Sequence, residues 1–245
     1  MPLCQGKHMK LSKTEKDFLK SYNIHDFDIP LASVDLCIFS IIDESLKVLL
    51  VKRSDYPLKD RWALPGGFVD IQTDKDLNAT AIRKLKEKTG VKAPYVEQVE
   101  TIGSNTRDPR GWSLTILYFA LLTYNSKKFV ATENVKWVSL KEAKKLNLAF
   151  DHLELLTKAI QRLRNKVSYT TLPIHILPKK FTLAELQKAY EIIMDRKVDK
   201  KSFRRRIEAS NLLSETGELI QDGGRPAKLF RIRSGSDTHF YNRSI

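Results

Sequence analysis

Apolar residues in the first two thirds of the chain form short runs typical of strands, separated by segments with helical periodicity. The strand-like runs lie at 33–42, 47–53, 95–104, 112–124 and 134–138. Three helices are predicted. Apolar residues recur at three- and four-residue spacing at 75–89 and 151–163, and at 139–146 Ser139 and Glu142 have the spacing of a capping box. This succession of strands and helices is typical of an α/β fold.

The pattern changes at 167–180, where two prolines and the absence of a helical period predict a linker. We therefore expect a first domain at 1–166 and a second domain at 181–245. The two domains should differ in architecture, because the sequence after the linker carries helical patterns first and a hairpin pattern last.

The second domain begins with Thr182 and Glu185, which have the spacing of a capping box at the start of a helix. A second helix is predicted at 200–211, with Phe203 and Ile207 facing inward. A hairpin closes the unit, with strands at 218–221 and 228–233 on either side of a turn that contains two glycines. Helix, basic helix and hairpin together predict a winged helix-turn-helix domain.

The amino-acid composition narrows the kind of binding partner and the cellular compartment that we expect for this protein. The 245 residues are 42% hydrophobic and 29% charged, and the net charge of +14 favours a polyanionic partner. Cys4 and Cys37 are too few for a disulfide framework or a zinc cluster, so we expect free thiols. The N-terminus lacks the apolar core of a signal peptide and the run at 36–42 is too short to span a bilayer, which predicts a cytoplasmic protein without a membrane partner. Residues 1–10 are expected to form a disordered tail.

The basic helix and the hairpin carry the candidate contacts to double-stranded DNA. An exposed cationic helix together with an arginine at a glycine-rich wing tip suits one major-groove and one minor-groove contact. The alternative is a solvated face without a partner, because runs of arginine are common on helix surfaces. The residues predicted to contact DNA are Lys200, Lys201, Ser202, Arg204, Arg205, Arg225 and Lys228.

The stretch 66–91 resembles the Nudix box, a loop–helix–loop that holds divalent metal with several glutamates. Its frame is present, because Arg83, Leu85, Glu87, Gly90 and Val91 are in register, although two extra residues lie between Gly67 and Arg83. The metal-binding glutamates of the box are mostly missing, because lysine occupies three of the four glutamate positions, at 75, 84 and 88. We expect a Nudix fold that has lost hydrolysis, with no catalytic residue, no metal site and no cofactor.

A degraded Nudix domain followed by a basic winged helix resembles the Nudix-related transcriptional regulators of bacterial NAD metabolism. The resemblance runs from about Leu11 to about Arg233 and includes the stretches 56–70, 105–122, 148–156, 201–208 and 223–230. It implies an α/β/α sandwich that senses ADP-ribose or a related NAD-cycle metabolite. It also implies a winged helix that represses NAD-biosynthesis genes as a homodimer on a palindromic operator. A related branch of regulators senses L-arabinose, so a sugar ligand is an alternative.

The ligand site is expected to combine the box with the loops beside it. Arginine side chains suit phosphates, glycines let backbone N–H groups approach an anion, and an aromatic ring can stack on adenine. The candidates are Arg53, Arg61, Trp62, Gly66, Gly67, Phe68, Arg83, Glu87 and Arg107. Structural roles compete with these: Arg83 and Glu87 are spaced to pair along one helix, and Trp62 also suits the core.

Two further expectations concern function. Asp151 and His152 are expected to be a helix cap and a surface histidine rather than a catalytic pair. An active ADP-ribose pyrophosphatase with an accessory nucleic-acid-binding domain is the alternative to a ligand-responsive repressor.

Overall fold

The computed structural model describes residues 12–90, 95–124, 133–221, 226–233, 238, 240 and 241. The chain divides into two compact units, one ending at Pro30 and one beginning at Leu31. The first contains helix α1 (Lys13–Ser21) and a 3-10 turn, η1 (Ile24–Asp26). Ser12 and Glu15 form a capping box at the start of α1, a helix that was not predicted from the sequence. The tail expected at 1–10 and the thiol of Cys4 lie outside the described residues.

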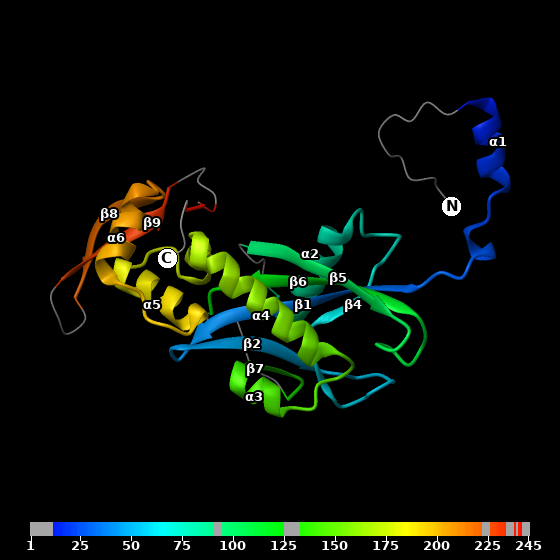
Figure 1. Ribbon diagram of the computed structural model, residues 1–245, viewed down its shortest axis with the longest axis horizontal. Helices are drawn as coiled ribbons and strands as arrows, with labels where there is room; N and C mark the ends of the chain where they lie inside the picture. Colours follow the sequence, from blue (N-terminus) through cyan, green and yellow to red (C-terminus); the bar gives the residue numbers. More distant parts are fainter. Residues whose placement is uncertain are drawn as a thin grey trace. The chain divides into compact units, whose positions relative to one another are not determined.

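A seven-stranded sheet forms the centre of the second unit (Figure 1). Strand β1 (Leu31–Ile42) pairs in parallel with β6 (Ser113–Leu121) and antiparallel with β2 (Ser45–Lys52). β5 (Tyr95–Ser104) continues the sheet beyond β6. Three short strands complete it: β3 (Trp62–Ala63), β4 (Gly66–Phe68) and β7 (Val135–Ser139). β3 and β4 fall in segments predicted to be loops, because two or three residues are too few to show a strand period.

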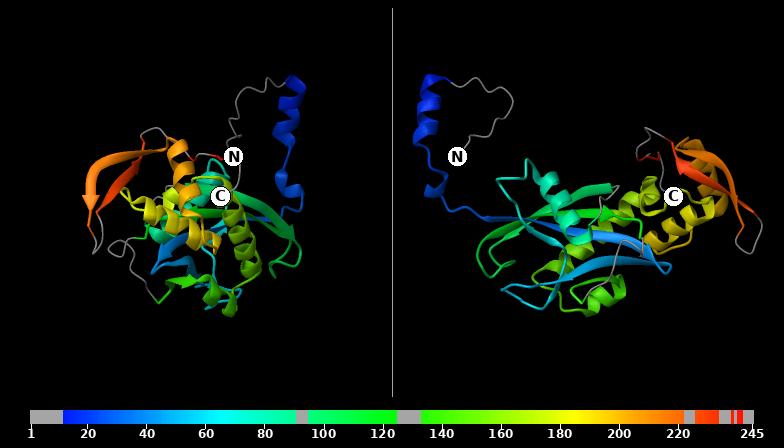
Figure 2. Two further views of the ribbon diagram at one scale, coloured as in Figure 1. Left: turned by 60° about the vertical axis from the view of Figure 1, so that its left-hand side comes forward. Right: turned by 180° about the vertical axis from the view of Figure 1, so that it is seen from behind.

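Helices cover both faces of the sheet, as expected for an α/β/α sandwich. Alternate residues of β1 point to opposite sides, so Cys37 and Phe39 belong to one apolar core and Leu36 and Ile38 to another. Helix α4 (His152–Tyr169) packs on the first core and lies in front of the sheet in Figure 1. Helix α2 (Leu77–Thr89) packs on the second and comes forward in the view from behind (Figure 2). A short helix, α3 (Leu140–Lys145), follows β7.

Helix α2 begins and ends where side chains satisfy its free backbone groups. The Asp76 carboxylate accepts a hydrogen bond from the Ala79 N–H at 2.7 Å. Gly90 ends the helix at φ 68°, a left-handed conformation that glycine adopts without steric cost. The Nudix-box helix is therefore present, two residues shorter at its start than predicted.

The segment expected to be a linker is packed and partly helical. Helix α4 continues to Tyr169, and a 3-10 turn, η2 (Leu172–Ile176), follows. Leu172, Ile174 and Ile176 are buried in the same apolar core as α4. The expectation of a segment without helical structure at 167–180 is wrong, because Pro173 lies at the start of η2, where a proline is tolerated, and Pro178 follows the turn.

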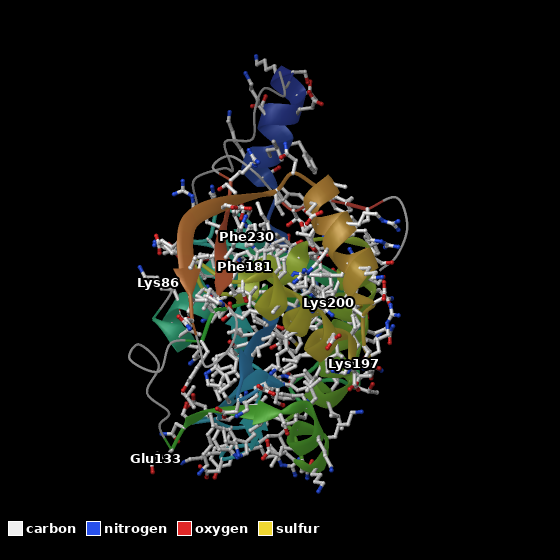
Figure 3. All side chains as sticks on the ribbon, turned by 90° about the vertical axis from the view of Figure 1, so that its left-hand side faces the viewer. Lys86, Glu133, Phe181, Lys197, Lys200 and Phe230 are labelled. Carbon is white, nitrogen blue, oxygen red and sulfur yellow. The ribbon has the colours of Figure 1, made fainter. Side chains whose placement is uncertain are left out.

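The C-terminal part is a winged helix-turn-helix, as predicted. It contains α5 (Leu183–Met194), α6 (Lys200–Ala209), β8 (Leu213–Ile220) and β9 (Ala227–Ile232). Strand β8 begins five residues before the predicted 218, because its first four residues, LSET, are mostly polar and show no strand period. Phe181 and Phe230 exchange two backbone hydrogen bonds, of 3.0 and 2.8 Å, which join the start of α5 to the wing (Figure 3).

Among the described residues, no helix has both the length and the apolar composition that crossing a bilayer requires. Cys37 is a buried free thiol, as expected.

Candidate functional site

A cavity of about 230 Å³ opens in the Nudix-like part of the chain, at one end of the central sheet. Strands β1, β2 and β4 supply its floor, and the loops before β3, β6 and α4 supply its walls. Its lining includes five cations and three carboxylates, an excess of two positive charges that favours an anionic ligand. These charged residues are Lys52, Arg53, Lys88, Arg107, Arg110, Asp35, Asp55 and Asp108.

Arg107 is held by two carboxylates beside the cavity floor. Its guanidinium donates two hydrogen bonds to Asp151, at 2.9 and 3.0 Å, and lies 3.7 Å from an Asp35 oxygen. Only 7% of its side chain is exposed. Such a bidentate pair fixes the side chain in place. Arg107 lines the cavity as predicted, but its hydrogen bonds tie α4 to the sheet and leave little of the group free for a ligand.

His152 is part of this floor, and the expectation of a surface histidine is wrong. The residue is buried, and its Nδ1 accepts a hydrogen bond from the Leu64 N–H at 2.9 Å. Burial lowers the pKa of His152, so the imidazole is neutral near pH 7, with its proton on Nε2 facing Asp35 at 3.8 Å. Asp151 makes no side-chain capping hydrogen bond either, because Arg107 occupies its carboxylate.

Glycine is required at two positions of the floor. A Cβ added to Gly66 would lie 2.2 Å from an Asp35 carboxylate oxygen and 2.6 Å from the Val34 carbonyl oxygen. A Cβ added to Gly67, which has φ 152°, would lie 2.9 Å from Cε of Lys84. The two glycines therefore let β4 lie close to β1 and let a lysine of α2 lie against the backbone of β4.

The cations of the cavity wall are anchored but closer to solvent. Arg53 donates to the carbonyl oxygens of Pro57, at 2.9 Å, and Asp55, at 3.3 Å. Burial and the nearby Arg110 lower the pKa of Arg53, which remains charged. Arg110 forms a bidentate pair with buried Asp108, at 3.0 and 2.7 Å, and Arg110 lowers the pKa of that carboxyl. Arg53 and Arg110 thus present fixed positive charge to a ligand.

On helix α2, ion pairs engage the carboxylates at the place where a Nudix enzyme needs free carboxylates to hold metal. The two oxygens of Glu87 accept from Arg83 at 2.9 Å and from Lys84 at 3.2 Å, which confirms the predicted Arg83–Glu87 pair. Arg83 also binds Asp74 bidentately and lowers the pKa of that carboxyl well below its usual range. Among the described residues, no group of three or more histidine, cysteine, aspartate or glutamate side chains is arranged to hold a metal ion.

The structure brings together about half of the predicted ligand residues. Arg53, Gly66, Gly67, Phe68 and Arg107 line the cavity. The others lie outside its lining. Arg61 is exposed 3.5 Å from the Asn147 side-chain oxygen, Trp62 packs against the core beneath the Lys136 ammonium, and Arg83 and Glu87 pair on α2.

Most of the lining was not predicted, including Asp35, Asp108, Arg110, Phe150 and His152. Asp35 could have been predicted as a site residue, because it is a carboxylate inside an otherwise apolar strand. Asp108 and Arg110 come from the loop before β6, and Phe150 and His152 come from the start of α4, two segments that the chain order alone does not bring together.

A second candidate site is the outer face of α6. Lys201, Arg204 and Arg205 are exposed, while Phe203 and Ile207 are buried as predicted. Within the described parts of the chain, no ion pair involves Lys200, Lys201, Arg204 or Arg205. This face, whose first residue Lys200 is labelled in Figure 3, has the free charge that phosphate contacts need.

The start of α6 and the wing complete this site. The N–H of Ser202 donates to the capping Asp199 carboxylate at 2.9 Å, so the first turn is fixed. On the wing, the Lys228 ammonium contacts both Glu215 oxygens at 2.9 Å, which partly neutralises it. Arg225, predicted at the wing tip, lies outside the described residues.

Known proteins share both parts of this chain. The NUDIX domain model matches residues 33–159, and the model of the NrtR DNA-binding winged helix domain matches residues 173–232. An ADPR responsive transcriptional repressor NtrR from Acinetobacter baylyi is 50% identical over 221 residues, which are 89% of this chain and 88% of that protein.

Solved structures agree. Shewanella oneidensis NrtR, crystallised with a 27mer DNA, superposes with a TM-score of 0.82 at 41% identity, over 87% of this chain and 99% of that one. The NUDIX domain of the same protein, cocrystallised with ADP ribose, matches with a TM-score of 0.56 at 43% identity, over 62% of this chain and 99% of that one. The resemblance seen in the sequence is confirmed, and the chain belongs to the NrtR family, in which a NUDIX domain is followed by a DNA-binding winged helix domain.

Proposed function

We propose that this protein is a transcriptional repressor that binds double-stranded DNA through α6 and the wing and responds to ADP-ribose bound in the cavity. The observation that carries the proposal is the exposed face of α6, whose basic side chains form no ion pairs among the described residues. Such a face on the second helix of a winged helix-turn-helix suits the major groove. The relative from Acinetobacter and the Shewanella structures support both the DNA and the ADP-ribose.

The ligand is proposed to be a phosphate-bearing metabolite rather than a neutral sugar. Cations exceed carboxylates in the cavity lining, and arginines such as Arg53 and Arg110 suit phosphate oxygens. L-arabinose carries no charge to match them. The family resemblance extends the proposal to a homodimer on a palindromic operator that controls NAD-biosynthesis genes.

We also propose that the NUDIX domain binds its ligand without hydrolysing it. The only box glutamate in register, Glu87, has both oxygens engaged by Arg83 and Lys84. Lys84 lies against Gly67, and Lys88 lines the cavity, so ammonium groups supply positive charge beside the cavity. Ligand binding should therefore need no divalent metal, because the lysines supply the neutralising charge.

Gel shifts on the protein's own upstream region test the proposed function. In EDTA, the protein should shift this DNA but not a scrambled duplex of equal length, and ADP-ribose should change the fraction shifted. The ADP-ribose effect should be equally large when Mg²⁺ replaces EDTA. No specific shift in either buffer would refute a DNA-binding repressor, and an effect of ADP-ribose only with Mg²⁺ would refute metal-free binding.

A hydrolysis assay distinguishes the repressor from an active pyrophosphatase. With Mg²⁺ or Mn²⁺, the purified protein should release no AMP from ADP-ribose above the background of a buffer control. Turnover on the order of 1 per second, within the ordinary enzyme range, would show that the alternative is correct. In the Lys84→Glu/Lys88→Glu variant, we expect ADP-ribose affinity in EDTA to fall, because two positive charges near the cavity become negative. A matched Lys144→Glu variant on exposed α3 should keep wild-type affinity.

A further inference from the structure

The turn between α5 and α6 determines the direction in which α6 continues from α5. Only four residues, at 195–198, separate the end of α5 from Asp199, which caps α6. Asp195 has a φ of 56°, in the left-handed region that aspartate tolerates better than most residues. Lys197 and Lys200, which flank the end of the turn, are labelled in Figure 3. Because the turn is short, a change in its shape changes the direction of α6.

One residue of α5, Glu191, contacts all four residues of this turn. Its backbone carbonyl accepts hydrogen bonds from the Asp195 N–H and, at 3.3 Å, from the Arg196 N–H. One oxygen of its carboxylate accepts from the Val198 N–H at 3.1 Å, and the other accepts from the Lys197 ammonium at 3.1 Å. The Val198 hydrogen bond lowers the pKa of Glu191, so the carboxylate is ionised near pH 7 and strengthens these bonds.

Gln187, one helical turn before Glu191, holds Val198 from the other side. Its side-chain amide donates to the Val198 carbonyl at 3.1 Å and to the Glu191 carboxylate at 3.4 Å. Both backbone groups of Val198 are therefore bonded to side chains of α5. The Val198 side chain also packs against the apolar core. Side chains that satisfy the backbone groups of a turn in this way fix its conformation.

The direction of α6 matters more for reading DNA than for burying its apolar face. Apolar contacts such as those of Phe203 and Ile207 are non-directional and permit small tilts. The ten residues of α6 span about 15 Å, so a tilt of about 10° at its start would move its far end by about 2–3 Å. Such a displacement is larger than the range of distances over which a hydrogen bond to a base edge forms.

We infer that Glu191, together with Gln187, is a positioning residue for DNA recognition, which fixes the turn and thereby the direction in which α6 presents its basic side chains to the major groove. This inference rests on the proposed binding of DNA through α6 and adds a determinant of sequence specificity that does not itself touch DNA. In the competing account, the packing of Phe203 and Ile207 sets the direction of α6 without help from the turn.

Fluorescence anisotropy on the upstream region and on a scrambled duplex of equal length tests this role. Glu191→Ala should lower the ratio of the two affinities about tenfold, because the charge-assisted hydrogen bond to Val198 is lost. Binding to the scrambled duplex should stay equal or become stronger, because a negative charge is removed and Lys197 is released. A smaller folded fraction would instead weaken binding to both duplexes by the same factor.

A conservative variant and a matched control separate positioning from loss of charge. Glu191→Gln keeps an acceptor for the Val198 N–H and should hold the affinity ratio within about threefold of wild type. Gln187→Ala should lower the ratio about threefold without any change of charge. The matched control is Glu154→Ala, since Glu154 is an exposed glutamate of α4 that also pairs with a lysine, and it should keep the wild-type ratio.

Hydrogen exchange followed by NMR gives a direct readout of the turn. In Glu191→Ala, the Val198 amide should exchange faster, whereas amides in the middle of α5 should keep their protection. Wild-type affinity ratios in Glu191→Ala and Gln187→Ala would overturn the inference and leave DNA binding intact. If Glu191→Ala does not fold, an unchanged ratio in Gln187→Ala alone overturns it. A wild type that binds both duplexes equally would instead refute the proposed function.

Discussion

Replacing Arg204 or Arg205 with alanine is expected to weaken operator binding in two different ways. The two side chains are adjacent on the exposed face of α6, so they leave the helix in different directions and cannot reach the same base edge. One should contact a base and the other a phosphate. Loss of the base contact should cost about 1–3 kcal/mol and relax specificity at one position. Loss of the phosphate contact should weaken all sequences alike and lower the salt slope by about one.

Fluorescence anisotropy on the upstream region, repeated at several salt concentrations and with single-base operator variants, separates these two effects. Lys144→Ala on α3 provides a matched control, because it removes one exposed positive charge far along the chain from α6. Equal affinity for wild type, Arg204→Ala and Arg205→Ala at moderate salt would mean that α6 does not contact DNA and that its charge is a solvated face.

Phe203→Ala should be the most destabilising single substitution considered, with an expected loss of about 3–5 kcal/mol in the free energy of unfolding of the winged helix. Phe203 is fully buried, and its ring meets the Tyr190 ring edge-on at 5.3 Å. The Tyr190 hydroxyl in turn donates to the Thr170 carbonyl at 2.6 Å. Removing the ring leaves a cavity at the point where α5, α6 and the end of α4 meet.

Native-state hydrogen exchange measures this loss locally, which matters because a chain of two domains need not unfold in one step. Protection in α5 and α6 should fall, whereas β1 and β6 should keep theirs. Phe203→Leu serves as the control and should lose much less, because it retains most of the buried volume. A loss below about 1 kcal/mol for Phe203→Ala would contradict the packing described here.

The elements with a long, regular pattern were predictable from sequence. Strands such as β1 and β6 and helices such as α2 show their period directly, and the glycine at 90 marks the end of α2. The Phe203–Ile207 pair gave the inner face of α6. Short strands were not predictable, because β3 and β4 are fixed by their neighbours in the sheet rather than by their own residues.

The candidate ligand site was predictable only in part, for a physical reason. Gly67 and Arg53 stood out because glycine and arginine suggest particular backbone and charge properties on their own. Phe150 and His152 look like core and surface residues in sequence, and their roles depend on contacts with Arg110 and Leu64, far away in the chain. The same limit applies to Arg107, since nothing near it in sequence shows that Asp151 occupies its guanidinium.

The buried junction between α4 and α5 has a mechanical consequence. Ile174 and Ile176 of η2 share one core with Leu163 and Val167 of α4 and with Ile193 of α5. Bending there would expose these side chains to water, at about 25 cal/mol for each Å² of apolar surface. The NUDIX domain and the winged helix domain of one chain should therefore move as one rigid body. In the proposed homodimer, a small rotation of one chain against its partner would displace the two α6 helices together with their NUDIX domains, which changes their match to the half-site spacing.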